Sequence, residues 1–255
     1  MIELLDVYRS YGSKVAVSGL NLNVYPGELL AYLGPNGAGK TTTIKMLVGL
    51  LRPTAGTIRI CGYDIVTQTR QAHQLVGYVP DEPYLYDKLT GREFLWFVGE
   101  VHALDRGKIA SRVAELTERF ELSNFLDELA ESYSHGMKQR VAFAAALLHD
   151  PAVLIVDEPM VGLDPRSARL VRILLGEMAA AGKSVLMSTH SLGVAEQIAS
   201  RIGIIDGGRL RFTGTLDQLR QTAPQDTLNL EELFLRFIAN RDLPVSNTAD
   251  PTPPA

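Results

Sequence analysis

Two spacings of hydrophobic residues alternate along the chain. Short runs of apolar residues, some alternating with polar ones, predict strands, whereas longer stretches with helical spacing predict helices. The predicted strands are Ile2–Val7, Lys14–Val24, Glu28–Leu33, Thr57–Cys61, Leu75–Val79, Ala152–Val156, Ser184–Ser188 and Arg201–Ile205. The predicted helices are Lys40–Leu50, Ile109–Phe120, Met137–Leu148, Pro165–Ala181 and Leu192–Ala199. Because strands and helices alternate, we expect an α/β fold with a mainly parallel sheet covered by helices.

The pattern becomes helical between about residues 88 and 150. Thr90 and Glu93 have the spacing of a capping box at the start of a helix. We interpret this stretch as a helical insertion between the early and the late strands. Phe94, Trp96 and Phe97 are expected to pack in its core, and a partly exposed apolar patch that receives a partner is the alternative.

Composition and charge narrow the class of protein. The 255 residues are 46% hydrophobic and 21% charged, as in ordinary soluble domains, and 25 basic against 29 acidic residues give a net charge of −4. This acidic balance disfavours a dedicated nucleic-acid binder. One cysteine, Cys61, excludes an internal disulfide and a cysteine-based zinc site. With neither a signal-peptide pattern nor an apolar run of about 20 residues, we expect a cytosolic protein that does not cross a membrane by itself.

A glycine-rich segment follows the predicted strand Glu28–Leu33 and precedes a predicted helix. Residues 34–41 match G-x-x-x-x-G-K-[ST], in which the glycines let the backbone curl and aim N–H groups at phosphate oxygens. The nucleotide-binding residues predicted here are Gly34, Pro35, Asn36, Gly37, Ala38, Gly39, Lys40, Thr41 and Thr42. Lys40 would bridge the β- and γ-phosphates, and the Thr41 hydroxyl would ligate Mg²⁺. A chance glycine-rich turn is the alternative.

Two carboxylates, Asp157 and Glu158, end the apolar run Val153–Val156. In open α/β sheets, ligands bind at the carboxyl ends of the strands. Asp157 is therefore predicted to hold Mg²⁺ through water, and Glu158 to polarise the water that attacks the γ-phosphate. Adjacent acids can also simply end a strand, but the phosphate-binding loop in the same chain favours the catalytic interpretation.

A second candidate phosphate site, Ser134-His135-Gly136, lies at the start of a predicted helix. A hydroxyl group and the exposed N–H groups of a helix N-terminus bind anions. Because the nucleotide already has its own loop, this second site indicates ATP held between two protomers. An ordinary serine cap followed by glycine is the alternative.

Taken in order, these segments resemble the ATP-binding-cassette (ABC) ATPases over about residues 2–219. Tyr11, the loop Gly162-Leu163-Asp164 and His190 occupy further landmark positions of that family. The resemblance implies a P-loop NTPase fold with an N-terminal antiparallel β-subdomain and an inserted helical subdomain beside the mainly parallel core sheet. It also implies ATP and Mg²⁺ as cofactors.

The resemblance further implies roles for individual residues. Ser134 and Gly136 would contact the γ-phosphate bound by the P-loop of a second protomer, and Asp164 would lie across that interface. His190 would hydrogen-bond the γ-phosphate and sense its loss, and Tyr11 would stack on adenine.

Two of the assigned roles, adenine stacking and Mg²⁺ contact, each have an alternative. Tyr8 competes with Tyr11 for the adenine, although it is expected to pack within the first strand. Asp81 follows a strand at the point where the family usually has glutamine, so that it would contact Mg²⁺ or, alternatively, face solvent in an acidic loop.

The implied organisation is one ABC ATPase domain over residues 1–220, with its helical subdomain at about 88–150. A C-terminal helical extension is expected at 221–240 and a disordered tail at 241–255. His135 and Met137 stand where many members have glycine and glutamine, and this variant is similar to export-type members, as is the predicted helix Asn229–Leu235.

The implied function is that of the ATP-binding and ATP-hydrolysing subunit of an ABC exporter. Closure of an ATP-bound dimer, made with an identical or related protomer, would drive separate transmembrane permease subunits. The chain would then lie peripherally on the cytoplasmic face of the cell membrane, and no nucleic acid is expected as a partner. The alternatives are a soluble ABC ATPase acting on ribosomes or DNA, and a P-loop kinase or GTPase, which would have no use for Ser134-His135-Gly136.

Overall fold

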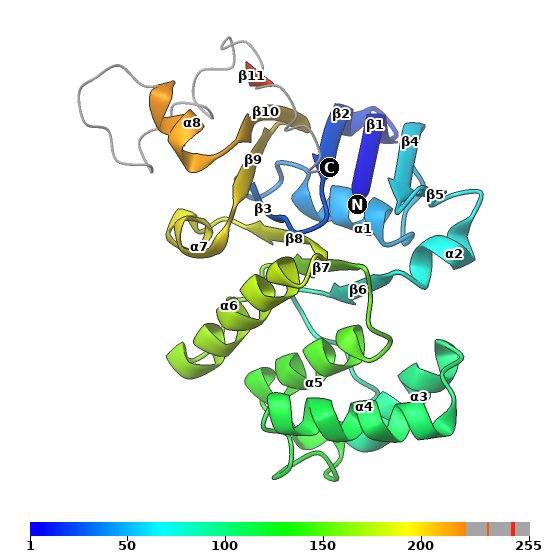
Figure 1. Ribbon diagram of the computed structural model, residues 1–255. Helices are drawn as coiled ribbons and strands as arrows, with labels where there is room; N and C mark the ends of the chain where they lie inside the picture. The colour runs from blue at the N-terminus through cyan, green and yellow to red at the C-terminus, as the bar shows by residue number, and fades with distance from the viewer. Residues whose placement is uncertain (223–233, 235–245, 248–255) are drawn as a thin grey trace.

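Two sheets organise the computed structural model, which describes residues 1–222, 234 and 246–247 (Figure 1). The first sheet is antiparallel and has the order β2-β1-β4-β5. Its strands are β1 (Ile2–Tyr11), β2 (Lys14–Val24), β4 (Ala55–Ile60) and β5 (Tyr63–Asp64). The second sheet has the order β11-β10-β9-β3-β8-β7-β6. Its strands are β3 (Leu29–Leu33), β6 (Val76–Val79), β7 (Val153–Asp157), β8 (Ser184–Thr189), β9 (Arg201–Asp206), β10 (Arg209–Gly214) and β11 (Ser246–Asn247).

Parallel pairing dominates the second sheet. The neighbours β6 and β7, β7 and β8, β8 and β3, and β3 and β9 are parallel, whereas β10 returns antiparallel to β9. The predicted α/β fold, with a mainly parallel core sheet and an N-terminal antiparallel β-subdomain, is therefore confirmed.

Helices cover the core sheet and also form a separate group at one end of the molecule. Those connected to the core strands are α1 (Lys40–Leu47), α2 (Thr69–His73), α6 (Pro165–Ala180), α7 (Leu192–Ile198) and α8 (Leu216–Gln221). Between β6 and β7, the chain forms α3 (Gly91–Val101), α4 (Arg106–Arg119), the short 3₁₀ helix η1 (Ala130–Ser132) and α5 (His135–Leu147). These inserted helices gather at the lower end in Figure 1, which confirms the predicted helical subdomain as part of the fold.

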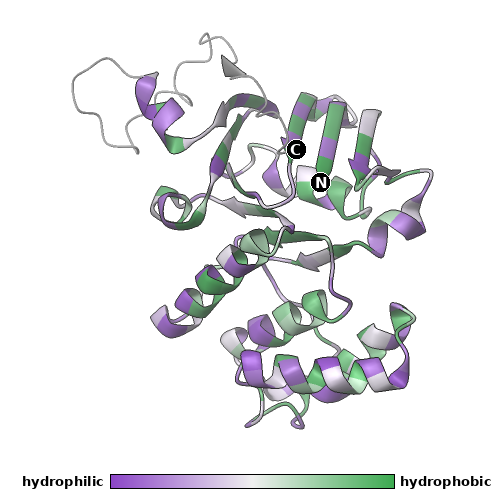
Figure 2. Cartoon of the chain, in the orientation of Figure 1, coloured by the Kyte–Doolittle hydropathy of each residue, from purple (hydrophilic) through white to green (hydrophobic). Residues whose placement is uncertain are grey.

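The core sheet is buried on both faces, and its sequence pattern explains why. Along β3, Leu29 and Leu33 join one hydrophobic cluster with the inserted helices and α6, while Leu30 and Tyr32 join a second cluster with the antiparallel sheet and α1. A strand covered on both faces reads as a continuous apolar run rather than an alternating one. Helices α4 and α6 differ from such a strand: in Figure 2, polar and apolar residues alternate along their ribbons.

Several elements differ from the prediction. Strand β1 continues to Tyr11 instead of ending at Val7, because its second half pairs with β2. Helix α1 ends at Leu47 rather than Leu50, and Gly49 follows with φ of +70°. The predicted capping box is present, since Thr90 accepts a hydrogen bond from the Glu93 N–H. The short elements β5, α2, β10 and α8 were not predicted.

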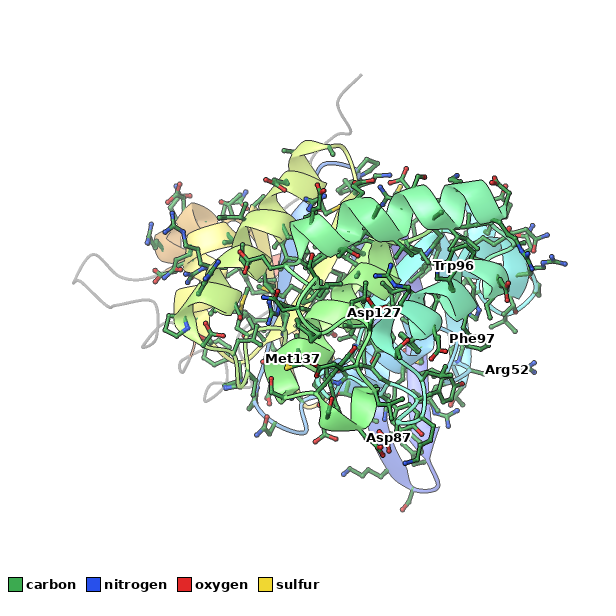
Figure 3. All side chains as sticks on the ribbon, turned by 90° about the horizontal axis from the view of Figure 1, so that it is seen from below. Arg52, Asp87, Trp96, Phe97, Asp127 and Met137 are labelled. Carbon is green, nitrogen blue, oxygen red and sulfur yellow. The ribbon has the colours of Figure 1, made fainter. Side chains whose placement is uncertain are left out.

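The aromatic residues of α3 divide between core and surface. Phe94 and Trp96 are partly buried against the core, as predicted. The prediction for Phe97 is wrong, because its side chain is 43% exposed on the outer side of the helix (Figure 3). Val101 at the end of the same helix is also exposed, at 67%.

The C-terminal predictions fall largely outside the described residues. Of the predicted extension, including its helix Asn229–Leu235, the structure describes residues up to 222 and Phe234, which is helical and buried. Of the predicted tail it describes β11, which pairs with β10. Within the described residues, none of the helices combines the length and the apolar character needed to span a membrane.

Two histidines stack where α3 meets the segment after α5. The rings of His102 and His149 lie 3.7 Å apart with an interplanar angle of 9°, and His149 Nε2 lies 3.1 Å from the Val76 carbonyl oxygen. Burial and, to a smaller extent, the neighbouring His102 ring lower the pKa of His149 to about 4. Burial also lowers the pKa of His102, so both imidazoles are neutral at pH 7.

We expect this pair to make the folded state less stable in mild acid. The unfolded chain binds a proton at residue 149 near pH 6.5, whereas the folded chain resists protonation until about pH 4, so stability falls as the pH falls through this window. Between pH 7 and pH 5 the loss is about 1–2 kcal/mol in the free energy of unfolding. Urea unfolding at both pH values measures it. His149→Gln, which does not titrate, should show a flatter pH dependence, and an unchanged slope in this variant would contradict the assignment.

Candidate functional site

The glycine-rich loop leaves the carboxyl end of β3 and leads directly into α1. Gly37 and Gly39 have φ of +80° and +113°, a region that residues with side chains rarely adopt. Gly34 and Gly39 are also tightly packed: an added Cβ would lie 2.4 Å from the Ile205 carbonyl oxygen and 2.7 Å from that of Ala16, respectively. Conformation and space together require glycine, and the resulting loop directs its backbone toward a cavity in front of the α1 N-terminus.

This cavity has a volume of about 650 Å³ and gathers most of the predicted site residues. The predicted residues that line it are Tyr11, Pro35, Asn36, Gly37, Gly39, Lys40, Thr41, Thr42, Asp81 and Glu158. Tyr11 is 45% exposed, and the Arg9 guanidinium lies 4.6 Å from its ring centroid. Tyr8 lines a different cavity, with Asp6 and Arg209.

Lys40 points back along the loop. Its side chain is buried, and Nζ donates to the carbonyl oxygens of Gly34, at 2.7 Å, and Pro35, at 3.4 Å. Nζ also lies 3.7 Å from Glu158 Oε1. A buried ammonium group beside a curled backbone and a helix N-terminus gives this cavity a positive end that favours phosphate.

Asp157 ends β7 at the floor of the site. Burial raises the pKa of its carboxyl, while hydrogen bonding from Ser188 and Thr41 lowers it and the carboxylates of Asp81 and Glu158 raise it. Ser188 Oγ donates to Asp157 Oδ1, and the buried Oδ2 accepts no hydrogen bond from the part of the chain that the structure describes.

These oxygens fit a hard divalent cation. An unpaired buried carboxylate oxygen, the Thr41 hydroxyl and a further carboxylate at Asp81 are the donor types that Mg²⁺ accepts. The described residues contain no group of three or more His, Cys, Asp or Glu that could enclose a metal. Mg²⁺ does not require one, because it usually keeps water and phosphate oxygens among its ligands.

Glu158 is held in an unusual conformation. Its φ of +46° is rare for a residue with a side chain, and its N–H donates to Ser188 Oγ at 3.1 Å and to the Ser188 carbonyl oxygen at 3.2 Å. Its Oε2 lies 3.0 Å from His190 Nδ1 and accepts from the His190 N–H at 3.3 Å. The carboxylate is therefore aimed into the cavity by two strands, β7 and β8, whose carboxyl ends lie side by side.

A family model described as ABC transporter matches residues 17–161, more than half of the chain. The chain belongs to the ABC transporter family. The matched range begins before the glycine-rich loop and ends after Glu158, so it includes that loop, Asp81 and the acidic strand.

Curated ABC relatives cover most of the chain. The linearmycin resistance ATP-binding protein LnrL of Bacillus subtilis (strain 168) is 38% identical over 228 residues, which cover 89% of this chain and 73% of that protein. The Nod factor export ATP-binding protein I of Paraburkholderia xenovorans (strain LB400) is 42% identical over 82% of this chain and 68% of its own length. The ABC transporter ATP-binding protein NatA of B. subtilis is 33% identical over 90% and 95%.

Solved ABC structures share the fold. The structure of an ATP-binding subunit of an ABC transporter superposes with a TM-score of 0.87 at 33% identity, covering 93% of this chain and 99% of that one. A dimeric ATP-binding cassette in a post-hydrolysis state, bound to ADP and Pi, superposes with a TM-score of 0.77 at 26% identity over 85% and 99%. The chain is thus an ATP-binding and ATP-hydrolysing ABC subunit with the P-loop NTPase fold.

The remaining predicted ABC residues lie outside this cavity. Ser134 caps α5 by accepting from the Met137 N–H at 3.3 Å. A Cβ added at Gly136 would meet no atom of the described residues within 4 Å. Asp164 caps α6, and hydrogen bonds from Ser167 lower the pKa of its carboxyl. The predicted site residues at the starts of α5 and α6 therefore form a second set that does not line the cavity.

Sequence reasoning missed residues that support the ABC site. Ser188, which binds both acidic residues, was predicted only as the last residue of a strand and not as a partner of Asp157. The turn Gly207-Gly208 also lines the cavity, and Gly208 donates to the Ala38 carbonyl oxygen at 2.9 Å. The two adjacent glycines that closely follow the predicted strand Arg201–Ile205 were the available signal for this close approach.

Proposed function

We propose that this chain is the ATPase of an exporter and acts on a separate transmembrane permease from the cytoplasmic face of the membrane. The support is that ABC relatives whose names refer to export or resistance match more than 80% of this chain. No nucleic acid is needed as a partner in this proposal. The net charge of −4 agrees with that expectation.

The proposed active form is a head-to-tail dimer with ATP between the protomers. The P-loop cavity of one protomer would bind the nucleotide, with Tyr11 against the adenine and Lys40 on the β- and γ-phosphates. Ser134 and Gly136 of the second protomer would complete the site, and Asp164 would lie at the interface. Two observations support this: the two sets of residues are separated within one chain, and a similar solved cassette is dimeric.

We assign Mg²⁺ to Thr41 and Asp157, with Asp81 as a further ligand. When bound, Mg²⁺ would neutralise charge that develops on the phosphates. Glu158 would accept a hydrogen bond from the attacking water and so orient it toward the γ-phosphate. His190, which contacts Glu158 Oε2 at 3.0 Å, would fix that carboxylate and donate to the γ-phosphate.

Purification of the chain from its own cells in mild detergent tests the proposed partner. We expect a polytopic membrane protein to co-purify in a fixed ratio, and its copy number distinguishes a homodimer from a pair of related ATPases. Co-sedimentation with ribosomes or DNA in place of a membrane protein would contradict the proposal and support the alternative of a soluble, non-transport ABC ATPase. A tagged, unrelated cytosolic protein from the same cells is the control.

A further inference from the structure

The imidazole of His135 lies against the backbone of Gly162. His135 is the first residue of α5, two residues before Met137, and Gly162 belongs to the loop between β7 and α6. A Cβ added at Gly162 would meet Cδ2 and Nε2 of His135 at 3.2 and 3.3 Å. Gly162 also has φ of +72°, which favours glycine. The positive φ favours glycine at this position, and an added Cβ would also require the exposed His135 side chain to shift by a few tenths of an ångström.

This contact joins two segments with different tasks in the proposed dimer. On one side, Ser134 and Gly136 flank His135, and the space beside Gly136 is open among the described residues. On the other side, Gly162 lies in the short segment that starts at Glu158 and ends at Asp164. One imidazole thus connects the segment that would meet the partner's nucleotide with the segment that carries the water-orienting carboxylate.

The segment from Glu158 to Asp164 is fixed at both ends. Glu158 is bonded to β8 through Ser188, and the Val161 N–H donates to the Glu158 carbonyl oxygen at 3.2 Å. Asp164 accepts hydrogen bonds from the first turn of α6. A segment fixed in this way has little room to relax, so a side chain that packs on its middle can influence the conformation at Glu158.

A second link between the helical subdomain and α6 is weaker. Arg166 and Glu121 form an ion pair at 2.6 Å, but their side chains are 76% and 45% exposed. Exposed pairs of this kind contribute little. His135 is also exposed, but it packs on the segment between Glu158 and Asp164 itself, whereas Arg166 lies beyond the end of that segment.

We infer that His135 is a positioning residue that couples the phosphate site at the start of α5 to Glu158 of the same chain. The inference rests on the proposed ATP-bound dimer. The partner's nucleotide holds the start of α5 in place, His135 holds Gly162, and the catalytic segment keeps Glu158 in its hydrolytic conformation. Each ATP therefore promotes hydrolysis of the other, and turnover depends cooperatively on ATP concentration.

His135→Ala tests the coupling, with Lys138→Ala, one turn further along α5, as the matched control. In His135→Ala we expect unchanged Tm, unchanged ATP affinity of the protomer, about tenfold lower kcat and a Hill coefficient close to one. His135→Asn, whose planar amide can pack on Gly162, should recover part of the turnover. A merely structural role would instead lower Tm in proportion to activity. Wild-type kcat and Hill coefficient in His135→Ala, or the same losses in Lys138→Ala, would overturn the inference.

A double-mutant cycle with Gly162→Ala tests the contact itself. Gly162→Ala should reduce kcat more strongly in the native background than in His135→Ala. In the His135→Ala background the new Cβ no longer clashes with the imidazole, and only the backbone strain remains. Equal losses in both backgrounds would show that the contact carries no coupling. A different result is expected if the proposed ATP-bound dimer itself is wrong. In that case the Glu158→Gln variant, with His135 unchanged, would remain monomeric in the presence of ATP.

Discussion

Glu158→Gln is expected to slow ATP turnover by about two to four orders of magnitude while ATP binding persists. In the structure Glu158 Oε1 lies 3.7 Å from Lys40 Nζ and Oε2 lies 3.0 Å from His190 Nδ1. The amide keeps the size and the hydrogen-bonding positions of the side chain but loses the charge that polarises the attacking water. Phosphate release measures turnover, and a fluorescent ATP analogue measures binding.

The same variant should accumulate as an ATP-bound dimer. If hydrolysis is what reopens the interface, a protein that binds ATP without hydrolysing it stays closed, and size-exclusion chromatography with ATP should show the dimer. Glu118→Gln, on the exposed face of α4, is the matched control and should turn over normally. Turnover within a factor of two of the native chain in Glu158→Gln would remove Glu158 from the proposed mechanism.

The fold could be predicted from the sequence where all structural requirements on a segment favour the same residue types. Val153–Val156 is uniformly apolar because β7 is covered on both faces, so that run predicted a buried core strand. The glycine-rich loop was equally clear, since its conformation and its packing both demand glycine. Elements of a few residues, such as β5 and α2, carry too little pattern to be predicted.

The site could be predicted only in part from the sequence, because its geometry depends on contacts between segments that are distant in the chain. Asp157 and Glu158 were predicted from the end of one strand, but their common partner Ser188 comes from the neighbouring strand. No local signal gives that pairing. The same holds for His135 on Gly162, where the sequence showed an unusual residue in a phosphate-binding segment without showing what it touches.

The sequence also does not show which of several neighbouring aromatic residues in a helix are buried and which are exposed. Phe94, Trp96 and Phe97 are adjacent aromatic positions of α3, and the first two pack against the core while Phe97 is exposed. Tyr84 and Tyr86, which are 78% and 47% exposed, extend the aromatic contacts from Phe97 outward. Their burial depends on how the inserted helices sit against β6, which the hydrophobic pattern of α3 does not determine.

Lys40→Met is expected to weaken ATP binding by about two to three orders of magnitude and to abolish hydrolysis. Lys40 is the buried cation of the cavity, and truncating one partner of a buried charge pair across a binding interface costs about 2–5 kcal/mol of affinity. Methionine keeps the length and apolar part of the side chain, so the effect is that of the charge. Isothermal titration with ATP and Mg²⁺ measures the affinity.

Lys45→Met provides the matched control, because Lys45 belongs to the same helix and is exposed. It should bind and hydrolyse ATP normally. The two active-site variants then separate binding from hydrolysis: Lys40→Met should remain monomeric with ATP, whereas Glu158→Gln should dimerise. An ATP-dependent dimer of Lys40→Met would mean that the interface closes without the phosphate contact at Lys40, and ATP bound in this cavity would no longer explain dimer formation.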